Sequence, residues 1–520
     1  MKKKLLGSVS YVMLIMVMSR VLSLVSTQFY MSKFGVKDME ISIYSYAVSL
    51  PNIIFNCFGT ALSTVVIPIY TDYISNNKRS NAKSFADNII TISSVFSLLL
   101  IAVGIAISPI LPKFTQFDST PEAYAFCTKA LMIMMPVMLF YGLNYIFQGM
   151  LQSEGVFGWP AFVSVPSSVV IICYVLFFSD SFGVTGLLVA TFVGLFMQAM
   201  ILIPPLLKKG YRYKFSFRLT DPDIIRAGKM TLPVLLGASS YQLNMFYNVN
   251  MIANFDGMVT LLTFVQNLIL NMVLAFVYSI TAVLYPKLTE FASTGKMNEY
   301  KETLGNVLNS VLLLLIPITF GLLCMRIPLL ELITKWGKIE STDVENAGML
   351  IAMYSIGIVG IGLKEILDRA FYSLKETRVS AVNGFIIMLV NILLSLLFIN
   401  FIGPFGIPLA YSLASLSGSA ILLIALRRRI GGYLKSTFTV GAKAVIASLI
   451  MSAAVILINR ALSDMLDDGV LERIIKLFLP SGIGVIIYAC LLYMFRVNEI
   501  RSIVGSIIIK FRYKNTKQVK

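Results

Sequence analysis

VMSRVLSLVSTQFY, residues 17–30, carries an arginine within a stretch that is otherwise typical of a membrane-spanning helix. About ten residues, most of them apolar, lie on each side of Arg20, so its side chain cannot easily reach water at a helix end. Ser23, Thr27 and Tyr30 follow at helical spacing and share the face of the arginine. A charge at the bilayer centre costs about 2.5–3.5 kcal/mol on insertion scales and nearly always faces a cavity or a partner. The stretch therefore predicts a spanning helix with one polar side.

The composition extends this interpretation to the whole chain. Of its 520 residues, 57% are hydrophobic and only 13% are charged, whereas roughly a quarter of the residues in a soluble protein are charged. Apolar runs longer than about 18 residues recur from end to end. The first run is too long for a removable signal peptide and has no cleavage site of small residues. We predict an all-α polytopic membrane protein with fourteen spans, near residues 6–33, 41–74, 85–110, 123–151, 157–179, 183–207, 224–253, 257–287, 303–325, 346–374, 379–402, 405–426, 436–459 and 474–496.

Lysine and arginine residues indicate how the spans are oriented. With the N-terminus inside, the cytoplasmic segments hold roughly three times as many of them as the outside segments. The richest inside stretches are residues 208–229, the RRR at 427–429 and the tail from Arg496. Both termini are therefore predicted to be cytoplasmic. The net charge of +17 then serves orientation and contact with anionic lipids rather than binding to nucleic acid.

Weak internal similarity divides the chain into parts. Three pairs of short motifs recur at nearly the same offset, namely VVIPIYTDY (65–73) with AVLYPKLTEF (282–291), FGVTGLLVA (182–190) with GPFGIPLA (403–410), and MLQSEG (150–155) with SLKETR (373–378). Duplication of this kind is the usual construction of secondary transporters. We expect two pseudo-symmetric six-helix lobes with a substrate bound between them near the midplane. The predicted parts are an N-lobe (1–207), a cytoplasmic basic linker (208–223), a C-lobe (224–429), two extra C-terminal helices (430–497) and a basic cytoplasmic tail (498–520).

The residue types present argue against most membrane-embedded enzymes. Histidine is absent, which removes the commonest general base and metal ligand. The five cysteines fall in apolar segments without metal-ligand spacing, as expected of small buried hydrophobic residues. The sequence has no glycine-rich phosphate-binding motif that would indicate ATP use. We therefore expect no catalytic residues, no metal and no cofactor, and a process driven by the membrane potential or an ion gradient.

Further polar side chains lie at middle to outer depth in the first, second, seventh and eighth predicted spans, which correspond to one another between the lobes. For a single amide, a contact between helices worth about 0.6 kcal/mol is the commoner explanation. For four corresponding helices that are polar at similar depth, a hydrated central cavity is favoured. Because this cavity has a fixed cation and no clear counter-anion, it should prefer an anionic ligand. The candidate cavity residues are Arg20, Ser23, Ser26, Thr27, Asn52, Asn56, Asn244, Asn248, Asn267 and Asn271.

The predicted tenth span ends in a cluster of charges. Lys364 with Asp368, and Glu365 with Arg369, are pairs of opposite sign at a spacing of four residues, which places each pair on one helix face. They are expected near the cytoplasmic end of the span. A structural cluster is the favoured interpretation, and a cytoplasmic gate is the alternative.

Four stretches together resemble a known family. They are SRVLSLVSTQFYMSKFG (19–35), LPNIIFNCFGTALSTVVIPIYTDY (50–73), QGMLQSEGVFGWPAF (148–162) and RAFYSLKETR (369–378). These stretches, with the total of fourteen spans, resemble the MurJ (MviN) family of lipid II flippases in the MOP exporter superfamily, across essentially the whole chain. The resemblance implies transfer of undecaprenyl-diphosphate-linked peptidoglycan precursor to the outer leaflet by alternating access, with the last two spans helping to form a groove for the lipid tail.

The resemblance also implies a role for Arg20 at the diphosphate, because it is the position that matches an arginine of the family's cavity. The other cavity arginines of the family fall on Ser26, Phe55, Asn56 and Asn267. A flippase for another polyprenyl-linked oligosaccharide, of teichoic acid, capsule or O-antigen type, is therefore the first alternative. A MATE-like multidrug exporter, which would need a membrane-embedded carboxylate, is the second alternative. A non-transporting scaffold and a membrane-bound synthase rank below it.

The same resemblance also predicts where the protein is located and what it binds. It implies a multi-pass protein of the bacterial plasma membrane. Its expected partners are the lipid-linked oligosaccharide, membrane lipids and cell-envelope synthesis proteins.

Overall fold

The computed structural model describes residues 2–334, 338–374, 376–431, 434–465 and 469–497, together with 499 and 501. All regular structure in these residues is helical. The described chain forms two compact units. The N-terminal unit runs to Leu268 and includes Lys338 and Ile339, and the C-terminal unit holds Ile269 to Thr334 and the described residues from Glu340 onward.

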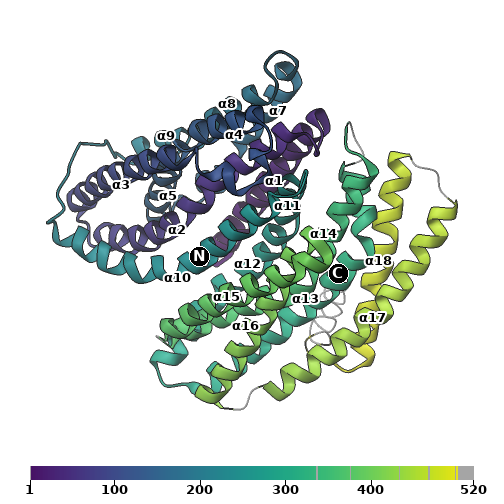
Figure 1. Ribbon diagram of the computed structural model, residues 1–520. Coiled ribbons are helices and arrows are strands. Elements are labelled where there is room, and N and C mark those ends of the chain that lie inside the picture. Colours follow the sequence, from purple (N-terminus) through teal and green to yellow (C-terminus); the bar gives the residue numbers. More distant parts are fainter. Residues whose placement is uncertain are drawn as a thin grey trace, which may run out of the picture. The chain divides into compact units, whose positions relative to one another are not determined.

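The helices of the N-terminal unit follow the predicted apolar runs (Figure 1). They are α1 (Lys2–Phe34), α2 (Met39–Ser75), α3 (Arg79–Ile107), η1 (Leu111–Phe114), η2 (Gln116–Asp118), α4 (Pro121–Met134), α5 (Val137–Ser153), α6 (Gly158–Ala161), α7 (Val165–Phe177), α8 (Ser179–Met200), α9 (Ile203–Lys208), α10 (Pro222–Ile252) and α11 (Met258–Val265). The boundary between the two units falls inside the short π-helix η3 (Gln266–Leu270).

Local sequence sets several of these helix ends. The Asp38 carboxylate accepts a hydrogen bond from the backbone N–H of Glu40 at 2.8 Å and caps the start of α2. Thr120 caps α4 in the same way, through the N–H of Ala123. These side chains satisfy N–H groups that have no partner inside the first turn of a helix. Pro136 lacks an N–H group and separates α4 from α5, so the fourth predicted span is two helices.

Within the N-terminal unit, α2 is the central element. It packs against α5 and α10, and also contacts α3, α4 and α11. Near one end of the unit, side chains of α2, α3, α5, α9 and α10 share a hydrophobic core that includes Tyr70, Phe85, Met150 and Leu206. The helix α1 packs instead against α6 and α7. The candidate polar residues of α1 and α2 are therefore carried by helices with different packing partners.

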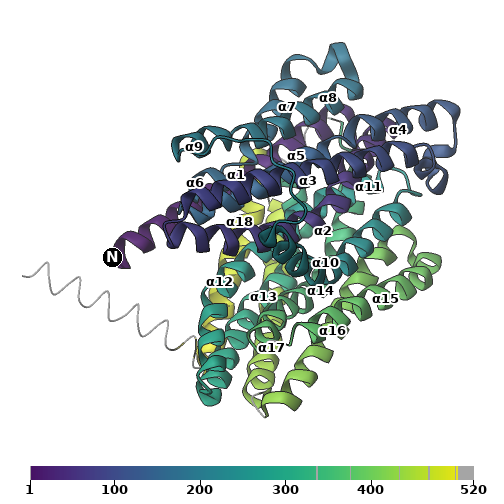
Figure 2. The same ribbon diagram turned by 90° about the vertical axis from the view of Figure 1, so that its left-hand side faces the viewer.

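The C-terminal unit is also a helical bundle. Its helices are α12 (Asn271–Ser293), α13 (Met297–Thr334), α14 (Ser341–Ser373), α15 (Thr377–Ile402), η4 (Gly403–Phe405), α16 (Gly406–Ile430), α17 (Leu434–Met465) and α18 (Val470–Met494). The pairs α15 with α16 and α17 with α18 lie side by side (Figure 2). The helix α14 packs closely on α16 because a Cβ atom on Gly360 would stand 2.7 Å from the backbone nitrogen of Leu416.

The structure confirms the predicted all-α class of a polytopic membrane protein. Each of the fourteen predicted segments coincides with one helix or with consecutive helices. Within the described residues, nine helical segments are long and apolar enough to cross a membrane. One of the nine, Thr377–Ile430, consists of α15 and α16, which pack against each other and so form a hairpin rather than one long span. The basic tail at 498–520 lies outside the described residues, apart from Glu499 and Arg501.

Candidate ligand-binding site

Arg20 projects from α1 at the edge of its packed face. On that face, the Ser19 hydroxyl donates to the backbone oxygen of Ala161 at 3.1 Å, and Ser23 shares a hydrogen bond of 3.2 Å with Ser168 of α7. Among the described side chains of α1, the exposed large apolar ones are Met18, Val21 and Val25, and they lie on the opposite side of the helix. Arg20 is exposed but lies outside this apolar stripe. Its position fits a side chain that faces a polar space rather than lipid.

Arg20 interacts electrostatically with an aromatic residue of α5, Tyr145, whose hydroxyl lies within range of the guanidinium charge. The Tyr145 hydroxyl donates a hydrogen bond of 2.6 Å to Oδ1 of Asn56 in α2. Among the described residues, no Asp or Glu forms an ion pair with Arg20. The cation therefore interacts with a tyrosine–amide pair, and no carboxylate among the described residues compensates its charge.

A second tyrosine–amide pair lies one turn away on the same two helices. Asn52 of α2 is exposed, and its side chain interacts with the hydroxyl of Tyr141. Tyr141 and Tyr145 are four residues apart on α5 and share a face. Close packing of Tyr145 on α2 requires Gly59, because a Cβ atom at that position would overlap the tyrosine ring. The structure thus brings Arg20, Asn52 and Asn56 to one region of the N-terminal unit. We call these three residues, together with Tyr141 and Tyr145, the arginine–tyrosine site.

The smaller hydroxyl residues of α1 are engaged by their own helix. The Ser23 hydroxyl donates to the backbone oxygen of Ser19 at 3.1 Å. Ser26 and Thr27 both donate to the backbone oxygen of Ser23, at 2.8 and 3.1 Å. Ser26 is also buried. These bonds satisfy the donors inside an apolar span, so in this conformation the three side chains support α1 more than they face a ligand.

Asn244 and Asn248 of α10 lie inside the protein. Their exposed fractions are 2% and 0%, and Nδ2 of Asn248 donates to Oδ1 of Asn244 at 3.1 Å. This bond lies within α10, and the prediction that the two amides line a cavity remains a prediction. Asn250 on the same helix accepts a hydrogen bond of 2.7 Å from Tyr46 of α2. Asn250 thus helps to hold α10 on α2.

The remaining predicted amides, Asn267 and Asn271, flank the boundary in the sequence between the two units. Asn267 is half-buried within η3 and belongs to the N-terminal unit. Asn271 begins α12 in the C-terminal unit, and its side chain is outside the described part of the structure. The prediction that these residues line a cavity between the lobes remains a prediction.

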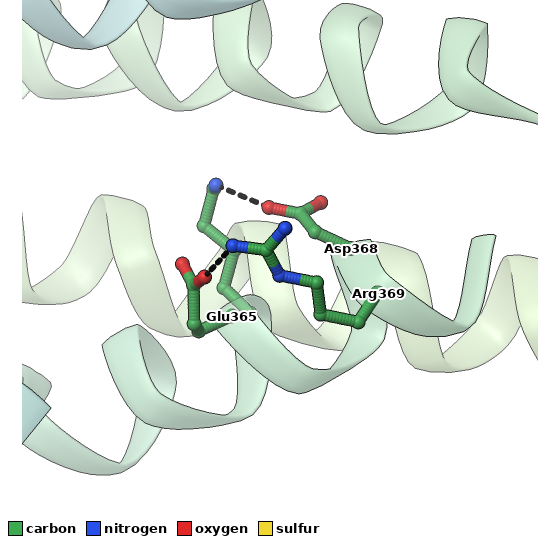
Figure 3. A network of polar contacts seen from close by, with 4 residues as sticks. Glu365, Asp368 and Arg369 are labelled. Carbon is green, nitrogen blue, oxygen red and sulfur yellow. Dashed lines mark hydrogen bonds and ion pairs between the residues drawn. The ribbon is translucent and has the colours of Figure 1, made fainter. Parts of the chain in front are cut away.

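The charge cluster of α14 forms the two predicted pairs (Figure 3). Nζ of Lys364 lies 2.6 Å from Oδ2 of Asp368, and Nη2 of Arg369 lies 3.0 Å from Oε1 of Glu365. The guanidinium of Arg369 also lies over the ring of Tyr372, at 5.8 Å from its centroid. The second carboxylate oxygen of Asp368, Oδ1, is buried without a hydrogen-bond partner in the described structure. The cluster belongs to the C-terminal unit and is separate from the arginine–tyrosine site.

Tyr141 and Tyr145 are absent from the set of site residues predicted from sequence. Aromatic residues are frequent in membrane spans, and a tyrosine there carries no signal of its own. The spacing of four residues between them was the available clue, since it puts both hydroxyls on one helix face. Only packing reveals that this face meets Asn52 and Asn56.

Two solved structures have the same fold. The structure described as "Lipid II flippase MurJ, inward closed conformation" superposes with a TM-score of 0.76 and 22% sequence identity, covering 93% of this chain and 98% of that chain. The "Inward-facing conformation of a multidrug resistance MATE family transporter of the MOP superfamily" gives a TM-score of 0.66 at 14% identity, covering 80% of this chain and 96% of that chain. This chain therefore shares the polytopic helical fold of these two structures.

Sequence comparison narrows the class to one family. A family model described as "Lipid II flippase MurJ" matches residues 31–475. The "Probable lipid II flippase MurJ" of Buchnera aphidicola subsp. Acyrthosiphon pisum is 26% identical over 513 residues, which cover 97% of this chain and 98% of the relative. The chain belongs to the MurJ family, as its sequence motifs indicated.

Proposed function

We propose that this protein is a flippase that carries lipid II, the undecaprenyl-diphosphate-linked peptidoglycan precursor, from the cytoplasmic to the outer leaflet of the bacterial plasma membrane. Its family and its relatives, which carry the name lipid II flippase, support this function along nearly the whole chain. The protein acts by alternating access and is a transporter rather than an enzyme. The observation that carries the proposal is the exposed guanidinium of Arg20, uncompensated by any described carboxylate, beside paired tyrosines and amides.

Each group of the site has a role that follows from its chemistry. Arg20 binds the diphosphate, because a guanidinium presents a fixed fork of donors that matches phosphate oxygens. Asn52 and Asn56 offer amide donors and acceptors to sugar hydroxyls. Tyr141 and Tyr145 hold these amides in place and present ring faces to the apolar side of a sugar ring. Asn267 and Asn271 remain candidates for further contacts with the headgroup.

The helices support a topology of fourteen spans in two lobes of six, followed by α17 and α18. Splitting the α15–α16 hairpin raises the nine apolar segments to ten. The long helices α1, α2 and α10, and the continuous path from α11 to α12, supply the other four. Both termini lie in the cytoplasm in this topology. The pair α17 and α18, with exposed apolar side chains such as Phe438, Leu457 and Phe478, forms a groove for the polyprenyl tail.

The transport step needs no nucleotide in this proposal. Lipid II is anionic and moves outward, so an inside-negative potential favours its transfer by about 2.3 kcal/mol per charge per 100 mV. An ion gradient is the alternative driving force. Membrane lipids and the cell-envelope synthesis proteins that make and use the precursor are its partners.

A flippase for another polyprenyl-linked oligosaccharide is the second candidate. The observation that favours it is the neutral character of the site around Arg20, where amides and tyrosines surround a single cation. Such a site selects for sugar hydroxyls as much as for phosphate charge. A MATE-like exporter of cationic drugs fits less well, because a cationic site repels such substrates.

Growth rescue tests the proposed function. In cells depleted of their own lipid II flippase, expression of this chain should restore growth, and the Arg20→Ala variant at equal membrane abundance should not. Failure of the wild-type chain despite good membrane levels would favour another saccharide lipid as its substrate. Full rescue by Arg20→Ala would mean that the arginine has a structural role.

A further inference from the structure

The connection between α9 and α10 is an extended strap that lies along α3 (Figure 1). We call residues 208–220, KKGYRYKFSFRLT, the basic strap. It lies wholly within the N-terminal unit. The proposed transport site uses none of its residues, although the strap is the richest basic stretch between the two halves of the sequence.

Side chains near the start of the apolar run of α3 hold the backbone of the strap. Oδ1 of Asp87 accepts hydrogen bonds from the Tyr211 hydroxyl at 2.7 Å and from the backbone N–H of Lys214 at 3.1 Å. Asn88 binds both backbone groups of Arg218, accepting from its N–H at 2.8 Å and donating to its oxygen at 2.9 Å. Burial and the bond to Asp87 raise the pKa of Tyr211, so its hydroxyl remains a donor at physiological pH.

One further residue of α3 completes the attachment. Oγ1 of Thr91 shares a hydrogen bond of 2.8 Å with the Tyr213 hydroxyl and lies 3.5 Å from the N–H of Ser216. The extended backbone thus finds its partners on side chains of a helix instead of on a neighbouring strand. Asp87, Asn88 and Thr91 therefore fix which way the strap presents its own side chains.

The strap presents two kinds of side chain to its surroundings. Its aromatic and aliphatic residues are unusually exposed, with exposed fractions of 49% for Tyr213, 79% for Phe215, 46% for Phe217 and 57% for Leu219. Its five basic residues are exposed as well, and the stretch contains no acidic residue. The basic residues are Lys208, Lys209, Arg212, Lys214 and Arg218. Large apolar side chains gathered in this way are costly to leave in water, and the cationic ones attract anions.

The depth of the strap indicates what covers this surface. Asp87 and Asn88 directly precede Ile89, where the apolar run of α3 begins. The strap crosses α3 at the start of this run, and the end of an apolar run is where we expect the boundary between the bilayer core and the headgroups. Aromatic residues favour that boundary, and lysine and arginine there attract anionic headgroups.

We propose that the basic strap is a preformed binding surface for anionic phospholipid headgroups, in which Phe215 and Phe217 enter the interface and the basic side chains bind phosphate. The basic side chains are complementary in charge to anionic headgroups, and the strap lies at the expected depth of those headgroups. Both observations favour lipid over a protein partner. The strap therefore selects the lipids that surround the N-terminal unit. This inference is independent of the transported substrate.

Quenching of a tryptophan in the strap by brominated lipids tests the proposal. The full-length protein carries Phe215→Trp, with Trp159→Phe and Trp336→Phe to remove the two native tryptophans, and is reconstituted with brominated phosphatidylglycerol or brominated phosphatidylcholine. We expect quenching in both lipids, with an association constant at least about threefold higher for phosphatidylglycerol, falling as salt increases. Absence of quenching, or equal constants for the two lipids, would overturn the proposal.

Two variants and a control separate charge from preorganisation. Replacing Arg212, Lys214 and Arg218 by Gln should bring the ratio of association constants close to one. The pair Asn88→Ala and Thr91→Val keeps every strap charge but removes side chains that hold the strap backbone. It should lower the ratio while thermal unfolding stays cooperative.

Replacing Arg427, Arg428 and Arg429 at the end of α16 by Gln removes as many charges elsewhere and should leave the ratio unchanged. A drop of the same size in this control would mean general attraction by net charge and would overturn a specific surface.

Discussion

At the scale of single residues, the account depends on how Arg20 is set among polar groups. Its neighbours Tyr145 and Asn56 share a hydrogen bond of 2.6 Å. Removal of the Tyr145 hydroxyl therefore takes one hydrogen bond from the Asn56 amide and leaves Arg20 unchanged. We expect Tyr145→Phe to lower the transport rate about fivefold, since a lost hydrogen bond to a positioned group is worth roughly 1 kcal/mol. Rates in proteoliposomes measure the effect. A rate equal to that of the wild-type protein would remove Tyr145 from the site.

A matched pair of glycine variants tests the packing of the same tyrosine. A Cβ atom on Gly59 would overlap the ring of Tyr145, whereas one on Gly228 of α10 would meet no atom within 4 Å. We expect Gly59→Ala to displace the ring and reduce transport strongly. Gly228→Ala should leave transport unchanged and stabilise its helix slightly. Equal transport by the two variants would contradict the position assigned to the ring.

The charge pairs of α14 allow a test between a structural cluster and a gate. Asp368 is buried, and the side chain of its partner Lys364 is 30% exposed. A structural pair predicts that Asp368→Leu loses about 1–3 kcal/mol of stability, a range reduced for the exposure of the lysine. The double variant Lys364→Met with Asp368→Leu should recover part of the loss, because no unpaired charge remains. Unchanged thermal stability with transport lost would instead identify a gate.

The site was only partly predictable from the sequence for physical reasons. Arg20, Asn52 and Asn56 stand out because charges and amides are expensive in an apolar run. Asn244 and Asn248 carry the same signal, yet they are buried and bonded to each other. Helical periodicity shows which residues share a face but leaves open whether that face meets a neighbouring helix or an open space. Assigning the tyrosines needs the packing of α5 on α2.

At the scale of elements, the hydrophobic pattern predicted nearly every helix. Predicted spans such as 224–253 and 379–402 match α10 and α15 to within two residues at each end. The internal breaks were harder to predict. Pro136 divides the predicted fourth span, and η3 interrupts the eighth with a short π-helix. Apolar runs specify that a segment crosses the bilayer, whereas local backbone geometry decides where the run bends.

The contact between α14 and α16 gives a prediction at the same scale. Alanine at Gly360 would place a Cβ atom 2.7 Å from the backbone nitrogen of Leu416, and backbone atoms of a packed helix cannot move aside easily. We expect Gly360→Ala to lower stability by about 1–3 kcal/mol. Gly305→Ala in α13 meets no atom within 4 Å and serves as the control. Thermal unfolding in detergent compares the two, and equal melting temperatures would contradict close packing of these helices.

At the scale of the whole molecule, the chain belongs to a family of lipid II flippases, and the proposed substrate is an anion. Transport would then move negative charge across the membrane. If lipid II crosses as an anion, its outward transfer in proteoliposomes should speed up under an inside-negative potential and slow down when the potential is reversed. A potassium gradient with a potassium ionophore sets the sign of the membrane potential. Identical rates under both signs would mean that charge transfer is compensated, which points to coupling with a counter-ion.

Movement of lipid II itself across a bilayer that contains only this protein tests the proposed function without contributions from other cell components. Lipid II with a fluorescent headgroup is incorporated in both leaflets of proteoliposomes, and a membrane-impermeant quencher is added outside. The account predicts that the wild-type protein makes the inner-leaflet pool accessible and that folded Arg20→Ala protein leaves it protected. An inner pool that stays protected with the wild-type protein, or equal access with both proteins, would contradict it.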